Sequence, residues 1–322
     1  MKTTEILHLP SDEAFRFLPE GPYPLGNGRF SWVAIQHGAS ANHGSLHIFD
    51  LNTNQDVTYD LPGRPGFAFP TDRDKFVVGC ERSIGVYSPE NGSYQVFIDG
   101  IDSDCSGTII NDAVTWDGNL IFGTKDLEFR TKKAGLYFWR QRDARLFRLR
   151  SDQICSNGKV VRPLDEDHVE LLDIDSPTRK VVAYRVNTSS GTIESERTVV
   201  DLSQDVGVPD GMTATLDGKS IVVSLYNPTS APFGRTVQYS VATGLVEETW
   251  STQGSPQATC PQWVIWKDHV WLVITTAIEH MSQERRAESP NAGGLFLAKT
   301  EYPCDVAAFE KLVPVFIEPT KL

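Results

Sequence analysis

The sequence predicts an all-β protein, a six-bladed β-propeller with four-stranded blades around a central channel. Three observations carry this prediction. Short runs of β-branched and aromatic residues alternate with Gly, Asn, Asp and Pro clusters along the whole chain. Similar units recur about every 40–50 residues, the length typical of propeller blades. No segment of helical length has a convincing amphipathic pattern.

The strands are predicted as hairpin-like pairs with turn residues at their ends. Residues 75–79 (KFVVG) are followed by 83–87 (SIGVY), and residues 220–225 (SIVVSL) by 236–241 (TVQYSV). Each pair ends in a turn of the Asn-Gly or Thr-Gly type. The polar segment 279–289 (EHMSQERRAES) is predicted as a loop or a short surface helix.

Six units account for the full length of the chain. We place their starts near the following residues: Glu20, Phe67, Asn111, Asn157, Asp210 and Cys260. This leaves no segment for a second domain, so residues 1–322 are predicted to form a single propeller domain. An array of two-sheet sandwiches is the structural alternative.

Composition narrows the classes of partner and compartment. The 322 residues are 40% hydrophobic and 22% charged, with a formal net charge of −12. Such an acidic chain repels phosphate backbones, so nucleic acid is an unexpected partner. The start of the chain has no apolar signal core, and no apolar run is long enough to span a bilayer. We therefore expect a cytoplasmic protein without membrane contact, monomeric or weakly homo-oligomeric, that acts on a small molecule.

Cysteine usage agrees with a reducing compartment. The chain has 5 cysteines, an odd number, and none of them form a C-x-x-C pair. A disulfide framework and a cysteine-ligated zinc site are both unexpected. Cys260 stands at a unit start and could face the channel, although a buried inert thiol is the more common case.

Polar residues at the unit starts indicate a metal site. Glu20, Asn111, Asn157 and Asp210 stand where the innermost strand of a blade begins, and these strand starts meet at one mouth of a propeller. Carboxylate and amide oxygens are the ligands that hard divalent cations favour. The alternative is that each Asn-Gly or Asp-Gly pair is only a turn. We interpret the later pair Asp217-Gly218 in that way, as well as residues 117–118.

These motifs resemble those of the senescence marker protein/gluconolactonase/luciferin-regenerating enzyme family. Residues 18–22 (LPEGP) look like its glutamate-bearing first motif, and Asn111 with Asp112 looks like its N-D-G motif. Residues 156–158 (SNG) and 209–212 (PDGM) look like two further motifs. The four occur in the family's order and at blade spacing, and the resemblance covers nearly the whole chain.

The resemblance implies a metal-dependent hydrolase of a small ester, most of all a sugar lactone. It implies one divalent ion, Ca²⁺ first, with Zn²⁺, Mn²⁺ or Fe²⁺ as alternatives, held by Glu20, Asn157 and Asp210. The metal would polarise the ester carbonyl and activate a water, with Asp210 as general base or nucleophile. Asn111 would orient the water or stabilise the oxyanion. Substrate contacts are assigned to Asn111, Asp112 and Glu128.

Several departures from the family pattern predict a remodelled substrate wall. Ile109 occupies a position where many sugar lactonases of the family have an arginine, and an isoleucine cannot bind a sugar hydroxyl or carboxylate. Lys159 follows Ser-Asn-Gly where an apolar residue is usual. Two alternatives therefore stay open: a phosphotriesterase of the diisopropyl fluorophosphatase type, or a non-catalytic propeller scaffold.

His43 and His47 are predicted to be solvated or edge residues. Four residues of strand span roughly 13 Å, which is too far for the two side chains to share one metal ion.

Overall fold

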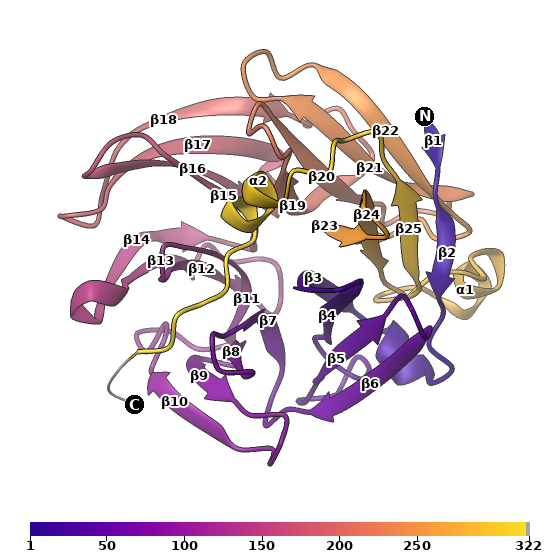
Figure 1. Ribbon diagram of the computed structural model, residues 1–322, viewed down its shortest axis with the longest axis horizontal. Helices are drawn as coiled ribbons and strands as arrows, with labels where there is room; N and C mark the ends of the chain where they lie inside the picture. Colours follow the sequence, from indigo (N-terminus) through magenta and orange to yellow (C-terminus); the bar gives the residue numbers. More distant parts are fainter. Residues whose placement is uncertain (320–322) are drawn as a thin grey trace.

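The protein is a six-bladed β-propeller, as the sequence predicts. The computed structural model describes residues 1–319. Its strands form six sheets, five of four strands and one of five, which stand in a ring around a central axis (Figure 1). Residues 1–319 contain only two α-helices, both short. The all-β prediction is confirmed, and the sandwich array is excluded by the radial arrangement of the sheets.

Five blades are built from four consecutive antiparallel strands. The first blade contains β3 (Pro19–Gly26), β4 (Arg29–Ala34), β5 (Ser45–Asp50) and β6 (Gln55–Asp60). The second contains β7 (Pro65–Pro70), β8 (Phe76–Cys80), β9 (Ser83–Tyr87) and β10 (Tyr94–Ile98). The third contains β11 (Thr108–Trp116), β12 (Asn119–Asp126), β13 (Ala134–Arg140) and β14 (Arg145–Gln153). The fourth contains β15 (Ser156–Pro163), β16 (His168–Asp175), β17 (Lys180–Asn187) and β18 (Thr192–Asp201). The fifth contains β19 (Val208–Ala214), β20 (Ser220–Tyr226), β21 (Phe233–Ser240) and β22 (Val246–Gln253).

The sixth blade is completed by the N-terminal segment, which closes the ring. Its strands are β23 (Ala258–Trp266), β24 (His269–Thr276), β25 (Leu295–Lys299) and β2 (Glu5–His8), with β2 on the outer edge. The preceding strand β1 (Lys2–Thr3) adds in parallel to β22 of the fifth blade. The first residues of the chain thus join two blades that come late in the sequence. All six predicted unit starts lie in the innermost strands β3, β7, β11, β15, β19 and β23.

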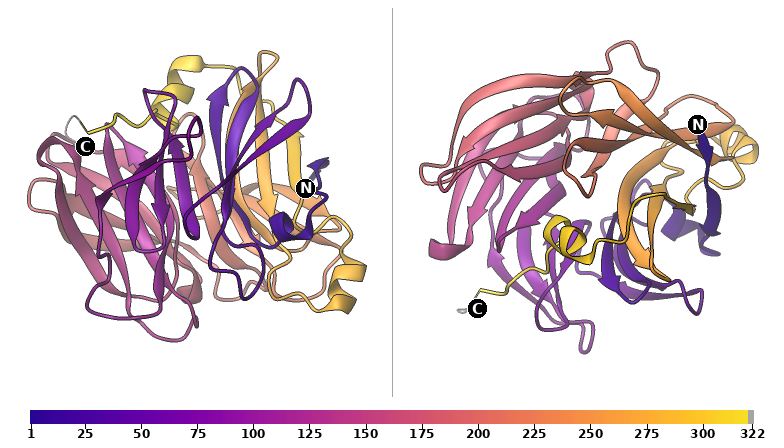
Figure 2. Two further views of the ribbon diagram at one scale, coloured as in Figure 1. Left: turned by 90° about the horizontal axis from the view of Figure 1, so that it is seen from below. Right: turned by 45° about the horizontal axis from the view of Figure 1, so that its top comes forward.

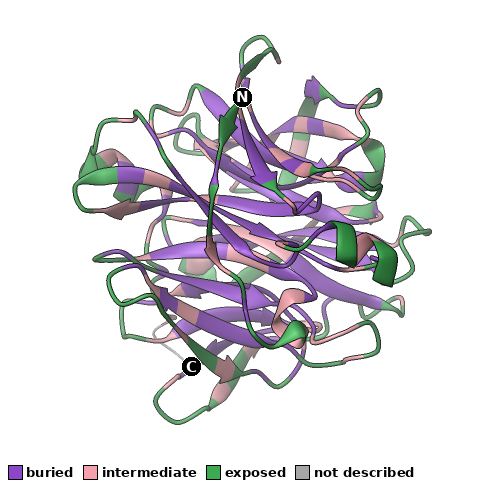
Figure 3. Cartoon of the chain, turned by 90° about the vertical axis from the view of Figure 1, so that its right-hand side faces the viewer, coloured by how far each residue is buried: buried purple, intermediate pink, exposed green. Residues whose placement is uncertain are grey.

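The core lies between the blades, where side chains of adjacent sheets meet. Figure 3 shows the inner parts of the strands buried and the exposed residues concentrated in loops, helices and outer edges. The largest fully buried side chains include four tryptophans: Trp32, Trp139, Trp250 and Trp263. The indole N–H of Trp263 donates to the carbonyl of Ala214 at 2.6 Å, which ties the sixth blade to the fifth. Each large ring buried in this way removes apolar surface from water and also fixes the angle between neighbouring blades.

The helices lie on opposite faces of the ring. Helix α1 (Gln283–Glu288) falls in the segment predicted as a loop or short helix, and helix α2 (Val306–Leu312) was not predicted. Figure 2 (left) shows α2 on one face and α1 at the other. Short 3₁₀ turns occur at η1 (Glu13–Arg16), η2 (Gln141–Asp143) and η3 (Ser176–Thr178). None of the helices in the described part of the chain has the length and apolar character needed to cross a membrane.

His47 lies in a buried network of the first blade, which corrects the prediction of a solvated or edge histidine. Its side chain is fully buried, and its Nδ1 lies 2.9 Å from an Asp56 oxygen. Its Nε2 lies 2.8 Å from the Ser45 hydroxyl, and its ring stacks on Trp32 at 3.8 Å. The prediction was wrong because the N-terminal segment packs on this face of the blade, where the Phe15 ring lies 4.8 Å from the His47 ring. This Ser-His-Asp set is enclosed, so no substrate reaches the hydroxyl. His43 is exposed.

Candidate functional site

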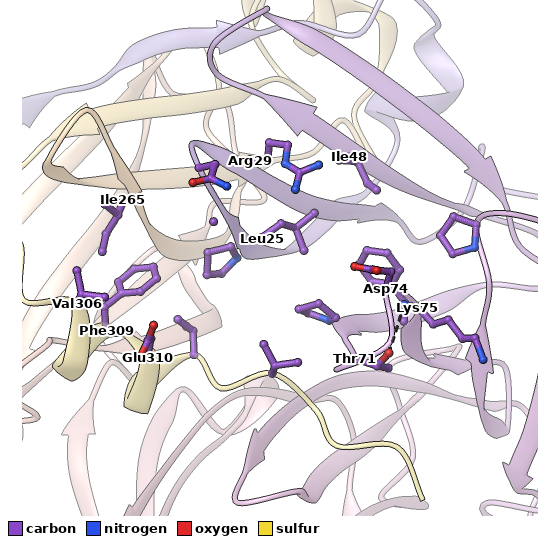
Figure 4. A pocket seen from close by; sticks show the side chains of 18 residues that line it. Leu25, Arg29, Ile48, Thr71, Asp74, Lys75, Ile265, Val306, Phe309 and Glu310 are labelled. Atoms are coloured by element: carbon purple, nitrogen blue, oxygen red, sulfur yellow. Dashed lines mark hydrogen bonds between the residues drawn. The ribbon is translucent and has the colours of Figure 1, made fainter.

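Two main cavities open at opposite mouths of the central channel. The larger, about 690 Å³, lies at the ends of β3, β7 and β23 beside α2. Figure 4 shows its lining, with Leu25 and Ile265 opposite Val306 and Phe309 of α2. None of the predicted site residues lines this cavity.

The second cavity, about 540 Å³, lies where the inner strands begin and gathers five of the six predicted site residues. They are Glu20, Asn111, Glu128, Asn157 and Asp210. They come from four different blades, and the chain separates the first from the last by 190 positions. Only the convergence of the inner strands at the axis brings them together. We call this cavity the candidate site.

Asp112 is the predicted site residue that lies outside this cavity. It lines a smaller space deeper in the channel, of about 100 Å³. The cause is a β-bulge at Asn111: the register passes from Ile110 opposite Thr124 to Asp112 opposite Gly123. The extra residue lets Asn111 face the mouth while Asp112 faces the channel interior.

Hydrogen bonds connect the polar residues of three neighbouring blades. The amide nitrogen of Asn111 donates to Asn157 Oδ1 at 2.8 Å, and Asn157 Nδ2 donates to the Ser176 hydroxyl at 2.9 Å. That hydroxyl donates to the carbonyl of Pro209 at 2.7 Å, directly before Asp210. This chain of donors fixes the side-chain orientations without using a carboxylate of the cavity.

The two N–H groups of Asn111 are both committed in this arrangement. One bonds Asn157 Oδ1, and the other bonds the carbonyl of Ser156 at 2.9 Å. The free polar atom of Asn111 is therefore its Oδ1, which can only accept. Of the two roles expected for this residue, orienting a water or a cation fits the geometry better than donating to an oxyanion.

Glycines allow the inner strands to approach closely enough to form the site. Gly158 and Gly211 lie inside β15 and β19, so the Asn157-Gly158 and Asp210-Gly211 pairs are not turns. A Cβ on Gly158 would lie 2.7 Å from the carbonyl oxygen of Asp210 and 2.5 Å from Met212 Cβ. One on Gly211 would meet the next blade in the same way. The blades could not converge with larger residues there.

Gly158→Ala is expected to push the fourth and fifth blades apart at the site. The added methyl group should cost about 1–3 kcal/mol of unfolding free energy, as overpacking does in other cores. Cation affinity should fall with it, because Asn157 and Asp210 lie on the two displaced strands. Thermal unfolding and calcium titration measure the two effects. Gly218→Ala is the control. Its φ of +66° strains any side chain, but its Cβ meets nothing within 4 Å, so it should lower stability without moving the strands of the site. A normal calcium affinity in Gly158→Ala would refute the coupling.

The acidic residues of the site raise one another's pKa. Burial, then the nearby Asp112 carboxylate, raises the pKa of Glu20 from 4.5 to about 8. Burial raises the pKa of Asp210 well above 3.8, with Glu20 and Asp112 adding to the shift. The Lys125 ammonium opposes both shifts without cancelling them. The site therefore favours the binding of a proton or of a cation.

Sequence reasoning missed several residues of the cavity wall. They include Lys125 in β12, Cys155, Ser176 in η3, and Tyr226, whose hydroxyl donates to the backbone carbonyl of Glu279 at 2.9 Å. Lys125 and Tyr226 lie on second strands and Ser176 in the turn after one, away from the motifs at the unit starts, whereas Cys155 lies two residues before Asn157. Only Lys125 gave a signal, as a charged residue in the apolar run 119–126 (NLIFGTKD).

The family of the chain follows from its sequence profile. Residues 18–278 match the profile described as SMP-30/gluconolactonase/LRE-like region, which is most of the chain. The chain belongs to this family. A Bacillus subtilis protein named as a sugar lactone lactonase, YvrE, is 26% identical to this member over 287 residues, which is 88% of this chain and 91% of that protein. The regucalcin of Danio rerio is 27% identical over 243 residues, 68% of this chain and 75% of that one.

Solved structures confirm the fold of this family member. A calcium-binding regucalcin from Agrobacterium tumefaciens superposes with a TM-score of 0.75 at 18% identity, covering 92% of this chain and 94% of that one. A gluconolactonase from Xanthomonas campestris superposes with a TM-score of 0.63 at 14% identity, covering 92% of this chain and 89% of that one. At such low identities these structures inform the fold alone.

Proposed function

We propose that this family member is a divalent-cation-dependent hydrolase of a small ester, most of all a sugar lactone. One observation carries the proposal: Glu20, Asn157 and Asp210, from three blades, line one cavity of a chain that belongs to a family with named lactonases. The relatives are named lactonases and regucalcins, which favours a lactone over a phosphotriester as substrate.

The charges and donor atoms of the site fit a hard divalent cation. Glu20 and Asp210 are two carboxylates that burial and mutual repulsion hold toward the protonated state. A divalent ion would balance both charges, and Asn157 Oδ1 would add a neutral oxygen ligand. Calcium is the first choice for such an all-oxygen set. When bound, such a cation supplies Lewis acidity, which polarises an ester carbonyl and acidifies water.

Four residues around the proposed cation position would have separate roles in hydrolysis and substrate binding. Asp210 is the carboxylate proposed to accept a proton from the attacking water, because it lines the cavity at the position proposed for the cation. Asn111 would orient that water through its free Oδ1. Glu128 is exposed at the cavity mouth and is proposed to contact the substrate. Asp112, deeper in the channel, is proposed to act on the substrate only through its charge.

Metal removal tests the proposal directly. We expect elemental analysis to find one divalent ion per chain, and a chelator to lower glucono-1,5-lactone hydrolysis by about 100-fold or more. Added Ca²⁺ should restore the rate. A phosphotriester assayed in parallel should be a poor substrate. Undiminished hydrolysis by metal-free protein would contradict cation dependence, and no hydrolysis of any lactone in a panel would contradict the activity.

A further inference from the structure

Lys125 is a buried cation in the wall of the candidate site. It lies near the end of β12, the residue as a whole is 4% exposed, and it lines the same cavity as Glu20 and Asp210. The ammonium faces the ring of Phe129, whose centroid lies 5.8 Å from Nζ. Within residues 1–319 no hydrogen-bond acceptor and no carboxylate pairs with this ammonium. Its three donors are therefore available to the cavity.

The other buried lysine of the channel shows how this chain satisfies such a charge internally. Lys159 is 3% exposed. Its Nζ donates to the carbonyl of Asn157 at 2.7 Å and lies 3.4 Å from an Asp173 oxygen. Removing an ammonium from water is costly unless an anion or several acceptors replace the water. Lys125 has no such partner in the described part of its own chain, so its ammonium is left to the water or to a ligand in the cavity.

The nearby carboxylates cannot serve as that partner in the cation-bound protein. This step rests on the proposed function. Glu20 and Asp210 would both ligate the divalent ion, so their charges would be balanced by it. Glu128 and Glu279 also line the cavity, but in the described residues neither carboxylate forms an ion pair with the ammonium. Lys125 would then be a positive charge beside a bound cation, which an anionic substrate would balance.

The position of Lys125 in the sheet supports contact with substrate. It stands directly opposite Ile109 in the β11–β12 ladder, so the two side chains share one face of the blade. On the facing strand, the β-bulge at Asn111 comes two residues after Ile109, so Lys125 stands close to the part of β11 that carries Asn111.

We propose that Lys125 binds an anionic substituent of the lactone, so that the preferred substrates carry a carboxylate or a phosphate outside the ring. The lysine acts as a specificity-determining residue. It holds the substituent while the ester bond lies at the cation. A neutral lactone would leave the ammonium uncompensated and should bind less well.

The test compares neutral and anionic lactones on variants of Lys125. The probes are glucono-1,5-lactone, glucaro-1,4-lactone with its carboxylate, and 6-phosphoglucono-1,5-lactone. The variants are Lys125→Met, which keeps length without charge, and Lys125→Arg, which keeps charge. Lys219→Met is the control, because it removes an exposed lysine whose side chain is 81% accessible. Circular dichroism checks that each variant is folded.

We expect Lys125→Met to lower kcat/KM for one of the anionic lactones by about 10- to 100-fold, chiefly through KM, as loss of a charge-assisted hydrogen bond does. The neutral lactone should change less than about 3-fold, and Lys125→Arg should retain most of the preference. The probe most affected tells a carboxylate from a phosphate. An equal loss of kcat on all three probes would overturn the proposal and place Lys125 at the reacting carbonyl.

Binding distinguishes failure of this inference from failure of the proposed function. Gluconate, glucarate and 6-phosphogluconate are titrated calorimetrically against calcium-loaded wild type and Lys125→Met. If no lactone is hydrolysed but a dianion binds and loses affinity in the variant, the hydrolase assignment is wrong and the anion site stands. If wild type and variant bind all three acids equally, the anion site is refuted, whatever the hydrolysis results.

Discussion

Asp210→Asn is expected to lower kcat/KM for lactone hydrolysis by about 10²- to 10⁴-fold, the range for loss of a general base. The change keeps the shape of the side chain and removes its charge and basicity. Because Asp210 is also a proposed cation ligand, calcium affinity should fall in the same variant. Initial rates at saturating calcium separate the two effects, since the loss of affinity can be overcome by concentration and the loss of the base cannot.

The stability of the same variant gives an independent check. In metal-free protein Asp210 is held toward its protonated form by burial and by Glu20. A neutral amide removes this repulsion, so the melting temperature of metal-free Asp210→Asn should equal or exceed that of wild type. Asp217→Asn is the matched control, an exposed aspartate in the turn after the same strand. Wild-type rates in Asp210→Asn would remove this residue from the mechanism, and a large fall in melting temperature would point to a structural role.

The repeat pattern predicted most of the fold because each blade carries its own local signals. A strand pair such as 220–225 and 236–241 ends in turn residues, and the same order recurs six times, so strand existence and sheet order follow from short-range patterns. The sequence did not predict that β2 closes the ring, or that helix α2 lies at the other mouth of the channel. Both are contacts between the chain ends and distant blades, for which no local signal exists.

Four of the five predicted residues that line the cavity stand where a motif coincides with the start of an inner strand, and Glu128 alone does not. Glu20, Asn157 and Asp210 stand at the same phase of their repeats, and phase places residues at one mouth. Asp112 lines the adjoining smaller space because a bulge turns successive side chains to different cavities, and phase alone does not reveal a bulge. Lys125 was missed because it stands at the end of a second strand, where a charged residue is usually exposed to solvent.

The acid–base state of Glu20 should make the stability of the metal-free protein depend steeply on pH. Its pKa in the folded protein is about 8, against 4.5 ordinarily. Between those values the folded state binds more protons than the unfolded state, so stability falls as pH rises through this window. A pKa unit corresponds to about 1.4 kcal/mol, which bounds the loss at about 5 kcal/mol between pH 4.5 and 8.

Saturating calcium should abolish this dependence, because an ion bound as proposed would hold Glu20 ionised in place of the proton. Calcium affinity should accordingly rise with pH until about pH 8, as the proton stops competing. Thermal unfolding of metal-free and calcium-loaded protein from pH 5 to 8 measures the first effect, and calcium titration at the same pH values measures the second. Glu20→Gln is the decisive variant: it should remove most of the slope in metal-free protein. A slope that persists unchanged in Glu20→Gln would mean that other groups titrate in this window, and that Glu20 is not the residue whose proton competes with calcium.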